Sequence, residues 1–284
     1  MKHSLGPDII VRIRRRLWKL PSRIVAILLS LRYRNDFVYT TKIQVVDGLF
    51  RLEQSYSEYK EVIHVFHPQR ISRYFIGIQE RLMKLFHEYC LHHIDDFRQG
   101  GYVVDIGSNV GELSLILARK FPEKLRFIRF EPSDNECRAA ERNLEGISQT
   151  EIRNPLWFES TTMQFFECNE TGDSSLIRPT SDAESVYLTT TTLDQELSHL
   201  MSEGIVLLKL EAEGAEPEVL RGGRGILPFI SWVAADLGPE RGIDKEETFA
   251  VCDKILKEAG FSLWATNPGG RKCYLYKNVK LQRE

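Results

Sequence analysis

The feature that most constrains the fold is a short apolar run that passes through a glycine-bearing loop into a helix-like pattern, YVVDIGSNVGELS at 102–114. The run ends at Asp105, and a turn between Gly107 and Gly111 follows it directly. A strand, a glycine loop and a helix N-terminus in this order open the nucleotide-cofactor sites of α/β proteins, because glycine lets the backbone come close to a ligand. The segment therefore predicts that a cofactor binds here.

A second apolar strand, LRFIRF at 125–130, ends in Glu131 and Pro132. An acidic residue at the end of this strand accepts hydrogen bonds from the hydroxyls of a ribose. NAD enzymes and methyltransferases share this feature, so Glu131 predicts a ribose-containing cofactor without separating the two classes.

The spacing of the glycine loop does separate them. A dinucleotide site needs a middle glycine for close approach to the pyrophosphate, and Asn109 stands at that place. Gly111 comes one position too early for the dinucleotide pattern, and the carboxylate of Glu112 would repel a diphosphate. A cationic or zwitterionic ligand suits that carboxylate better, and S-adenosylmethionine carries a sulfonium and an amino group. The loop thus favours S-adenosylmethionine over a nicotinamide cofactor.

A second group of polar residues surrounds the end of another buried strand. Ile205–Leu210 is almost entirely apolar, as expected for a strand covered on both faces, yet Lys209 interrupts it near its end. Glu211 follows directly, and Asp236 ends the next strand, ISWVAAD at 230–236. Ligands of open α/β sheets bind outside the carboxyl ends of the strands, so we expect these side chains at the site.

Apolar strands and helical patterns alternate through the second part of the chain, which predicts an α/β fold with a doubly wound, mainly parallel sheet. The expected strands are 102–106, 125–130, 149–153, 205–210, 230–236, 261–265 and 272–277, and the expected helices are 111–120, 134–145, 193–200, 215–222 and 244–259. A polar, β-rich excursion is expected at about 157–191. We divide the chain into a basic arm (1–35), an N-terminal extension or helical cap (36–100) and the α/β domain (101–284).

Several segments resemble the FkbM family of S-adenosylmethionine-dependent methyltransferases. They are VVDIGSNVGE (103–112), FEPSDNECRAAERNL (130–144), DSSLI (173–177), TTLDQEL (191–197), LLKLEAEGAEPEVLRGG (207–223) and DLGPERG (236–242). The resemblance implies a class I methyltransferase (Rossmann-like) fold with an antiparallel final pair of strands, and S-adenosylmethionine as cofactor. It also implies O-methylation of a sugar or glycan in a polysaccharide, glycolipid or secondary metabolite. Glu211 stands where the family usually has aspartate, and Ser108 where it has alanine.

Site roles follow from the two polar groups and from the resemblance. Cofactor contacts are assigned to Asp105, Gly107, Ser108, Asn109, Gly111, Glu112, Glu131 and Pro132. Glu211 and Asp236 are candidate general bases, and Lys209 is expected to orient or polarise the acceptor. No metal is assigned, although hard oxygen ligands could alternatively bind Mg²⁺. The carboxylates of that alternative are Glu211, Glu213, Asp236 and Glu240. The loop residues 173–175 could meet cofactor or acceptor, or form an ordinary turn.

Positive charge is concentrated at the N-terminus. The formal net charge is −2, yet residues 1–35 contain nine Lys and Arg against Asp8 alone. Segment 7–34 combines this charge with apolar residues at helical spacing, which fits an interfacial helix on anionic lipid; a helix packed on its own domain or on a partner subunit fits the same pattern. Its apolar run is too short to span a bilayer, which takes about 20 residues. It lacks the regular interleaving of aromatic and basic residues that forms a platform for stacked bases, so no nucleic acid partner is expected.

The five cysteines show no C-x-x-C pairing, which argues against a zinc site or a disulfide framework and for a reducing cytosol. We therefore expect a cytoplasmic enzyme, with peripheral contact at the inner face of the membrane if the basic arm binds lipid. Two other classes stay open from the sequence: a nicotinamide oxidoreductase, and a non-catalytic scaffold protein that keeps the fold.

Overall fold

The computed structural model describes residues 21–33, 39–168, 174–178 and 184–281. The chain forms two compact units, Met1–Arg81 and Leu82–Glu284, which are described one at a time. This division falls inside one helix, α3 (Ile78–Glu88), whereas the predicted boundaries follow residues 35 and 100; the three-part division stays a prediction. Most of the basic segment 7–34 lies outside the described residues. Within the described ranges, no helix is long and apolar enough to cross a membrane.

The first unit is built on a three-stranded antiparallel sheet in the order β1-β2-β3. Its elements are α2 (Ser22–Tyr33), β1 (Thr40–Val46), β2 (Leu49–Tyr56), β3 (Tyr59–Val65) and the 3₁₀ segment η1 (Pro68–Tyr74). Asp47 and Gly48 join the first two strands with positive φ of 51° and 79°, as a two-residue hairpin turn requires. The two strands therefore join as a hairpin within one continuous sheet.

The second unit contains a seven-stranded sheet in the order β13-β14-β10-β9-β4-β5-β6. Its strands are β4 (Gly101–Ile106), β5 (Leu125–Phe130), β6 (Gln149–Ile152), β9 (Ile205–Leu210), β10 (Ile230–Asp236), β13 (Phe261–Thr266) and β14 (Cys273–Asn278). Neighbouring strands are parallel except at β14, which runs antiparallel to β10 and to β13. This order, with one reversed strand beside the edge, is that of class I methyltransferases, and it confirms the predicted fold class.

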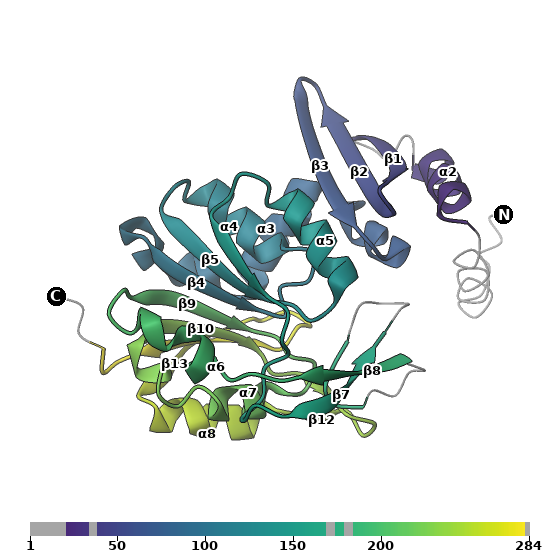
Figure 1. The fold of residues 1–284 in the computed structure, drawn as a ribbon. Helices are drawn as coiled ribbons and strands as arrows, with labels where there is room; N and C mark the ends of the chain where they lie inside the picture. Colours follow the sequence, from purple (N-terminus) through teal and green to yellow (C-terminus); the bar gives the residue numbers. More distant parts are fainter. Residues whose placement is uncertain (1–20, 34–38, 169–173, 179–183, 282–284) are drawn as a thin grey trace. The chain divides into compact units, whose positions relative to one another are not determined.

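Helices cover both faces of this sheet (Figure 1). On one side lie α4 (Glu112–Lys120) and α5 (Asp134–Asn143), and on the other lie α6 (Leu193–Leu197), α7 (Glu216–Arg221) and α8 (Phe249–Glu258). Two of these helices begin beside the predicted site. Gly111 is the N-cap of α4, and Pro217 lies in the first turn of α7, where its missing N–H leaves no hydrogen bond unmade.

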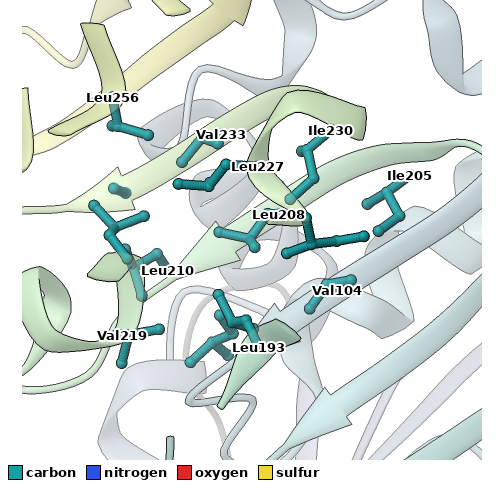
Figure 2. Close-up of a cluster of buried hydrophobic side chains, with 14 of the residues drawn as sticks. Val104, Leu193, Ile205, Leu208, Leu210, Val219, Leu227, Ile230, Val233 and Leu256 are labelled. Atoms are coloured by element: carbon teal, nitrogen blue, oxygen red, sulfur yellow. The ribbon is translucent and has the colours of Figure 1, made fainter. Parts of the chain in front are cut away.

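The apolar core lies between the middle strands and the helices of the second side. Every residue of β9 and of β10 is buried. Val104, Leu208 and Val233 come from three adjacent strands and belong to one cluster with Leu256 of α8 (Figure 2). Full burial of such a side chain contributes about 1.5–3 kcal/mol. The carboxyl ends of these strands are therefore firm positions on which to build a site.

One predicted helix starts later than expected. The helix predicted at 244–259 begins at Phe249, because Gly242 and Lys245 have positive φ of 67° and 51°, which a helix does not tolerate. The residues before it form a short antiparallel pair, β11 (Pro239–Arg241) and β12 (Glu246–Glu247). The expected polar excursion contains a second such pair, β7 (Thr162–Glu167) and β8 (Glu184–Thr189).

Candidate active site at the carboxyl edge of the sheet

Three adjacent strands bring the predicted site residues together. β9 pairs with β4 on one side and with β10 on the other, and all three are parallel, so their carboxyl ends meet at one edge. Asp105 of β4 lies opposite Lys209 of β9 in the register. Glu211 directly follows β9, and Asp236 is the last residue of β10. The two polar groups found separately in the sequence therefore form one site, at the edge where open α/β sheets bind ligands.

The loop between β4 and α4 turns sharply and lies against the residue that follows β9. Gly107, Asn109 and Gly111 have positive φ of 64°, 48° and 79°. A Cβ on Gly107 would come within 2.0 Å of the carbonyl oxygen of Glu211. Only glycine permits this approach of two backbones. Gly107, predicted as a cofactor contact, is therefore also required where the loop after β4 touches the residue that follows β9.

Glu131, directly after β5, holds the other side of this loop. Its Oε2 accepts a hydrogen bond from the backbone N–H of Asn109 at 2.8 Å, and its Oε1 accepts one from the N–H of Ser133 at 3.0 Å. Pro132 between them is half-buried and has no N–H to donate. The carboxylate is thus fixed at the end of the second strand, the position from which a ribose is bound in this class of fold.

Asp105 lies beneath the loop. Its side chain is fully buried, and its Oδ2 accepts a hydrogen bond from the Ser114 hydroxyl of α4 at 2.7 Å. Its Oδ1 faces the Lys209 ammonium at 3.4 Å. The carboxylate therefore ties β4 to a helix on one side and to β9 on the other. Direct contact between Asp105 and the cofactor stays a prediction.

Ser108 is supported by an arginine that the sequence analysis did not select. Its Oγ accepts a hydrogen bond from Nη1 of Arg129 at 3.2 Å. Arg129 is fully buried, and its guanidinium also binds Gln149 at 2.5 Å and Glu151 at 2.6 Å, both on β6. A buried guanidinium needs such partners, because an unpaired buried charge is strongly unfavourable. The sequence did contain the signal, since Arg129 interrupts an apolar strand as Lys209 does.

Lys209 connects the cofactor loop to the acidic residue after β9. Its Nζ donates to the carbonyl oxygens of Ile106 at 2.7 Å and of Gly107 at 2.8 Å. The same nitrogen lies 3.4 Å from Asp105 and 3.1 Å from Glu211. Burial disfavours the charged ammonium, but the Glu211 and Asp105 carboxylates outweigh it and raise the pKa of Lys209. With these four neighbours the ammonium positions the loop; contact with an acceptor stays a prediction.

Glu211 is surrounded by donors. Its Oε2 accepts a hydrogen bond from the Tyr89 hydroxyl at 2.7 Å and lies 3.1 Å from Lys209, and its Oε1 binds the guanidinium of Arg271. Burial alone would raise the pKa of this carboxyl, but Arg271 and Lys209 hold the pKa well below its usual range. Glu211 therefore stays ionised, and a carboxylate with so low a pKa is a weak proton acceptor.

Arg271 joins the two carboxylates predicted as general bases. It lies in the loop between β13 and β14, and its Nε donates to Oδ2 of Asp236 at 2.5 Å while Nη2 binds Glu211. The guanidinium carbon lies 5.0 Å from the centre of the Tyr89 ring, within range of a cation–π contact. Sequence reasoning missed both partners. Arg271 lies in a polar loop without a distinguishing pattern, and Tyr89 falls in the predicted N-terminal extension, outside the predicted α/β domain.

Glu240, in β11, is a third carboxylate near this group, and its surroundings differ. It is half-buried, and no residue in the described part of the chain donates a hydrogen bond to its carboxylate. Burial and the negative charges of Asp236 and Glu211 raise the pKa of Glu240 to about 8, against the opposing effect of Arg271. This group therefore changes its charge near neutral pH, whereas Glu211 does not.

The turn after β9 is fixed from two sides. Oε1 of Glu216 accepts hydrogen bonds from two backbone N–H groups of this turn, at 2.9 and 3.1 Å. The hydroxyl of Ser175 donates to the carbonyl oxygen of Glu213 at 2.9 Å. Of the loop residues with an open role, Ser175 thus supports the acidic turn, while Asp173 lies outside the described residues.

The alternative of a magnesium site does not fit these side chains. The guanidinium of Arg271 already binds the carboxylates of both Glu211 and Asp236, which the magnesium alternative would require as ligands. Across the described residues, no group of three or more His, Cys, Asp or Glu side chains is placed to hold a metal ion.

The sequence from residue 105 to residue 263, more than half of the chain, matches the family model described as the Methyltransferase FkbM domain. The chain belongs to the FkbM methyltransferase family. The resemblance noted in the sequence is thereby confirmed, and the protein is a methyltransferase whose cofactor is S-adenosylmethionine.

Individual relatives of this FkbM methyltransferase are distant. Methyltransferase 1 of Beauveria bassiana (strain ARSEF 2860) is 22% identical over 210 residues, which are 65% of this chain and 81% of that protein. A SAM-dependent methyltransferase from Aquifex aeolicus aligns with a TM-score of 0.41 and 13% identity, over 74% of this chain and 92% of that one. A putative rRNA-methylase from Clostridium thermocellum aligns with a TM-score of 0.42 and 12% identity, over 69% of this chain and 97% of that one. Family membership rests on the FkbM domain itself.

The residues at the edge fit the cofactor of the family. Glu131 is fixed at the strand end where a ribose is predicted to bind, and Glu112 is an acidic residue in the first turn of α4, where a dinucleotide site would bind a diphosphate. These carboxylates suit a ligand that carries positive charge. When bound, S-adenosylmethionine supplies an electrophilic methyl group, and the side chains around the edge must orient an acceptor towards it.

Proposed function

We propose that this FkbM methyltransferase methylates a hydroxyl group of a sugar or glycan acceptor. The supporting observation is the group of carboxylates Glu211, Asp236 and Glu240 at the strand ends, next to the cofactor loop. Transfer to a hydroxyl requires removal of a proton from a weakly acidic oxygen, and a positioned carboxylate can provide this. Carboxylates also accept hydrogen bonds from the neighbouring hydroxyls of a sugar.

In this proposal the edge has a cofactor half, which is the loop 107–111 with Glu131, and an acceptor half, which contains Glu211, Asp236 and Arg271. The loop around Asn109 and the carboxylate of Glu131 bind the cofactor. Lys209 positions the loop and Glu211 together through its contacts with both. Arg271 keeps Glu211 ionised, and its ion pairs with Glu211 and Asp236 fix both carboxylates beside the acceptor.

Cofactor binding is tested first, by calorimetric titration of the full chain with S-adenosylhomocysteine and, as the control, with NADH. We expect binding of S-adenosylhomocysteine in the micromolar range and none of NADH. Binding of NADH alone would contradict the proposal and support an oxidoreductase.

The acceptor class is tested by transfer of a tritiated methyl group from S-adenosylmethionine to separate pools of polysaccharides, glycolipids, small hydroxylated metabolites and peptides. A methyl ether on a hydroxyl resists mild alkali, whereas a methyl ester on a carboxyl group is released by it. Alkali-stable label in a carbohydrate pool supports the proposal. Label in peptides, or label lost in alkali, contradicts it, and cofactor binding without any transfer supports a scaffold protein instead.

We also propose that the protein binds peripherally to the anionic inner face of a membrane through its N-terminal arm. In α2, Ile24, Ile27 and Leu28 are exposed at helical spacing on one face, while Val25 and Ala26 are buried. Residues 1–35 add nine Lys and Arg against a single acidic residue, and such charge is attracted to anionic lipid.

Vesicle sedimentation tests this contact. The chain should sediment with vesicles that contain phosphatidylglycerol and stay in solution with pure phosphatidylcholine, and added salt should release it. Ile27→Asp should abolish sedimentation. The matched control is Ile243→Asp, which changes an equally exposed isoleucine of the second unit and should have no effect. Equal sedimentation of both variants would contradict the proposal.

A further inference from the structure

Four charged side chains form a row across the seven-stranded sheet, each on the last residue but one of its strand. They are Glu151 of β6, Arg129 of β5, Asp105 of β4 and Lys209 of β9. These strands are adjacent, and each of the four residues lies opposite the next in the register. Side chains of register partners share one face of a sheet, so negative and positive charges alternate along one side of it. The row therefore links the edge strand β6 to the centre of the site.

This row lies on the face of the sheet that is opposite the apolar core. Ile128 and Phe130, the neighbours of Arg129 in β5, both belong to the apolar cluster. Because successive side chains of a strand point to opposite faces, Arg129 faces away from that cluster. Asp105 of the same row binds the hydroxyl of Ser114 in α4. Arg129 therefore lies on the face that carries α4, the helix that follows the cofactor loop.

Both cations of the row hold the cofactor loop. Lys209 donates to two carbonyl oxygens at the start of the loop, and Nη1 of Arg129 donates to Oγ of Ser108 at 3.2 Å. The backbone N–H groups of Gly107 and Ser108 donate to the carbonyl oxygen of Phe130, at 2.9 and 3.1 Å. Ser108 is thus bound to β5 through its backbone and through its side chain.

Packing alone does not explain an arginine at this position. Arg129 is fully buried, and an apolar side chain in place of a buried ion pair is often at least as stabilising. Glu151 would keep a partner without Arg129, because Nε of Arg153 donates to its Oε1 at 2.7 Å. Gln149 and Glu151 accept from Nε and Nη2 of Arg129, at 2.5 and 2.6 Å, and so fix the direction of its guanidinium. That direction presents the remaining nitrogen, Nη1, to Ser108.

We propose that Arg129 is a positioning residue for S-adenosylmethionine, which holds the cofactor loop in its binding shape through Ser108. The guanidinium is planar, and two of its three nitrogens are bound on β6, so the third has a fixed place beneath the loop. A loop that is fixed before the cofactor arrives loses less conformational entropy on binding, and such preorganisation raises affinity. This role belongs to the cofactor half and is the same for any acceptor.

Calorimetric titration of the full chain with S-adenosylhomocysteine tests this role without an acceptor. Arg129→Lys keeps the charge but lacks the fork that reaches β6 and the loop together, and Ser108→Ala removes the oxygen that Nη1 binds. Each substitution should weaken binding about 10-fold, as expected when a hydrogen bond to a charged group is lost. The double variant should bind within about two-fold of Arg129→Lys, because both substitutions remove the same contact.

Two matched substitutions serve as controls and should bind within about two-fold of wild type. Arg153→Lys changes the other arginine that binds Glu151. Ser231→Ala removes a hydroxyl that is as buried as that of Ser108 and has no hydrogen-bond partner among the described residues. Unchanged affinity in Ser108→Ala would overturn the proposal, even if Arg129→Lys fails to fold. Losses that multiply in the double variant would also overturn it, because the two residues would then act separately.

Discussion

The cofactor half and the acceptor half of the edge are built in different ways. In the cofactor half, side chains satisfy the backbone: Glu131 accepts from the N–H groups of Asn109 and Ser133, and Lys209 donates to two carbonyl oxygens of the loop. In the acceptor half, side chains satisfy one another through ion pairs, with Arg271 at the centre. The cofactor half therefore depends on backbone shape, and the acceptor half depends on charge balance.

This difference says which changes each half can tolerate. A backbone-built site fails when a side chain is added where none fits. A charge-balanced site fails when one charge is removed, because its partners remain buried without compensation. Four substitutions test this contrast.

The largest effect is expected at Gly107. Gly107→Val places a Cβ where the carbonyl oxygen of Glu211 lies 2.0 Å away, at a φ of 64°. The left-handed conformation alone costs about 1–3 kcal/mol for such a residue, and the backbone clash adds to it. Calorimetry should show loss of S-adenosylhomocysteine binding, and urea denaturation a clear loss of stability. Gly146→Val is the matched control, because Gly146 has a φ of 80° and nothing within 4 Å. Equal effects of both variants would show that strain, and not the contact between the halves, is decisive.

The next largest effect is expected at Lys209, which belongs to both halves. Lys209→Met leaves Asp105 buried without its ammonium partner, and breaking a buried pair in this way costs about 3–5 kcal/mol. The variant should also bind S-adenosylhomocysteine more weakly, since two loop carbonyls lose their donor. Lys257→Met removes an exposed pair with Asp253 and should cost less than about 1 kcal/mol. Unchanged cofactor affinity in Lys209→Met would contradict this prediction and show that the cofactor half does not depend on this lysine.

Arg271→Lys should affect the acceptor half alone. Lysine keeps the charge but lacks the planar fork that reaches Asp236 and Glu211 together, so about 1–3 kcal/mol of stability should be lost. Affinity for S-adenosylhomocysteine should stay within about two-fold, because the substitution leaves the loop contacts in place. A large fall in affinity, measured by calorimetry, would contradict the division into two halves.

The smallest effect is a pH dependence of stability at Glu240. The folded pKa of about 8 is raised above the value of the unfolded chain, so this group stabilises the protein at low pH, and that stability is lost as the pH rises through 8. After discounting for partial exposure, the loss is on the order of 1 kcal/mol. Urea denaturation at pH 5.5 and pH 9 should show that Glu240→Gln gains stability relative to wild type at the higher pH only. A constant difference at both values would refute the raised pKa.

The contrast between the halves also explains how far the sequence could be interpreted. The cofactor half could be predicted because its residues are contiguous and follow backbone rules, with glycines at positive φ and an acidic residue ending a strand. Lys209 was found because a charge inside an apolar strand is conspicuous, and Arg129 could have been found by the same rule.

Other parts could not be predicted because they depend on distant pairing. Arg271 follows Glu211 by sixty positions and reaches it only because β14 inserts between β10 and β13. The helix predicted at 244–259 is apolar at helical spacing, yet its first residues pair as β12 with β11.

The place of Arg271 near the C-terminus affects the order in which the site is completed during synthesis. Glu211, Asp236 and Tyr89 all leave the ribosome before the guanidinium that joins them. Until β14 is made and inserted, the two acidic groups at the ends of β9 and β10 repel each other without a cation between them. A chain that stops short of Arg271 therefore has an incomplete acceptor half.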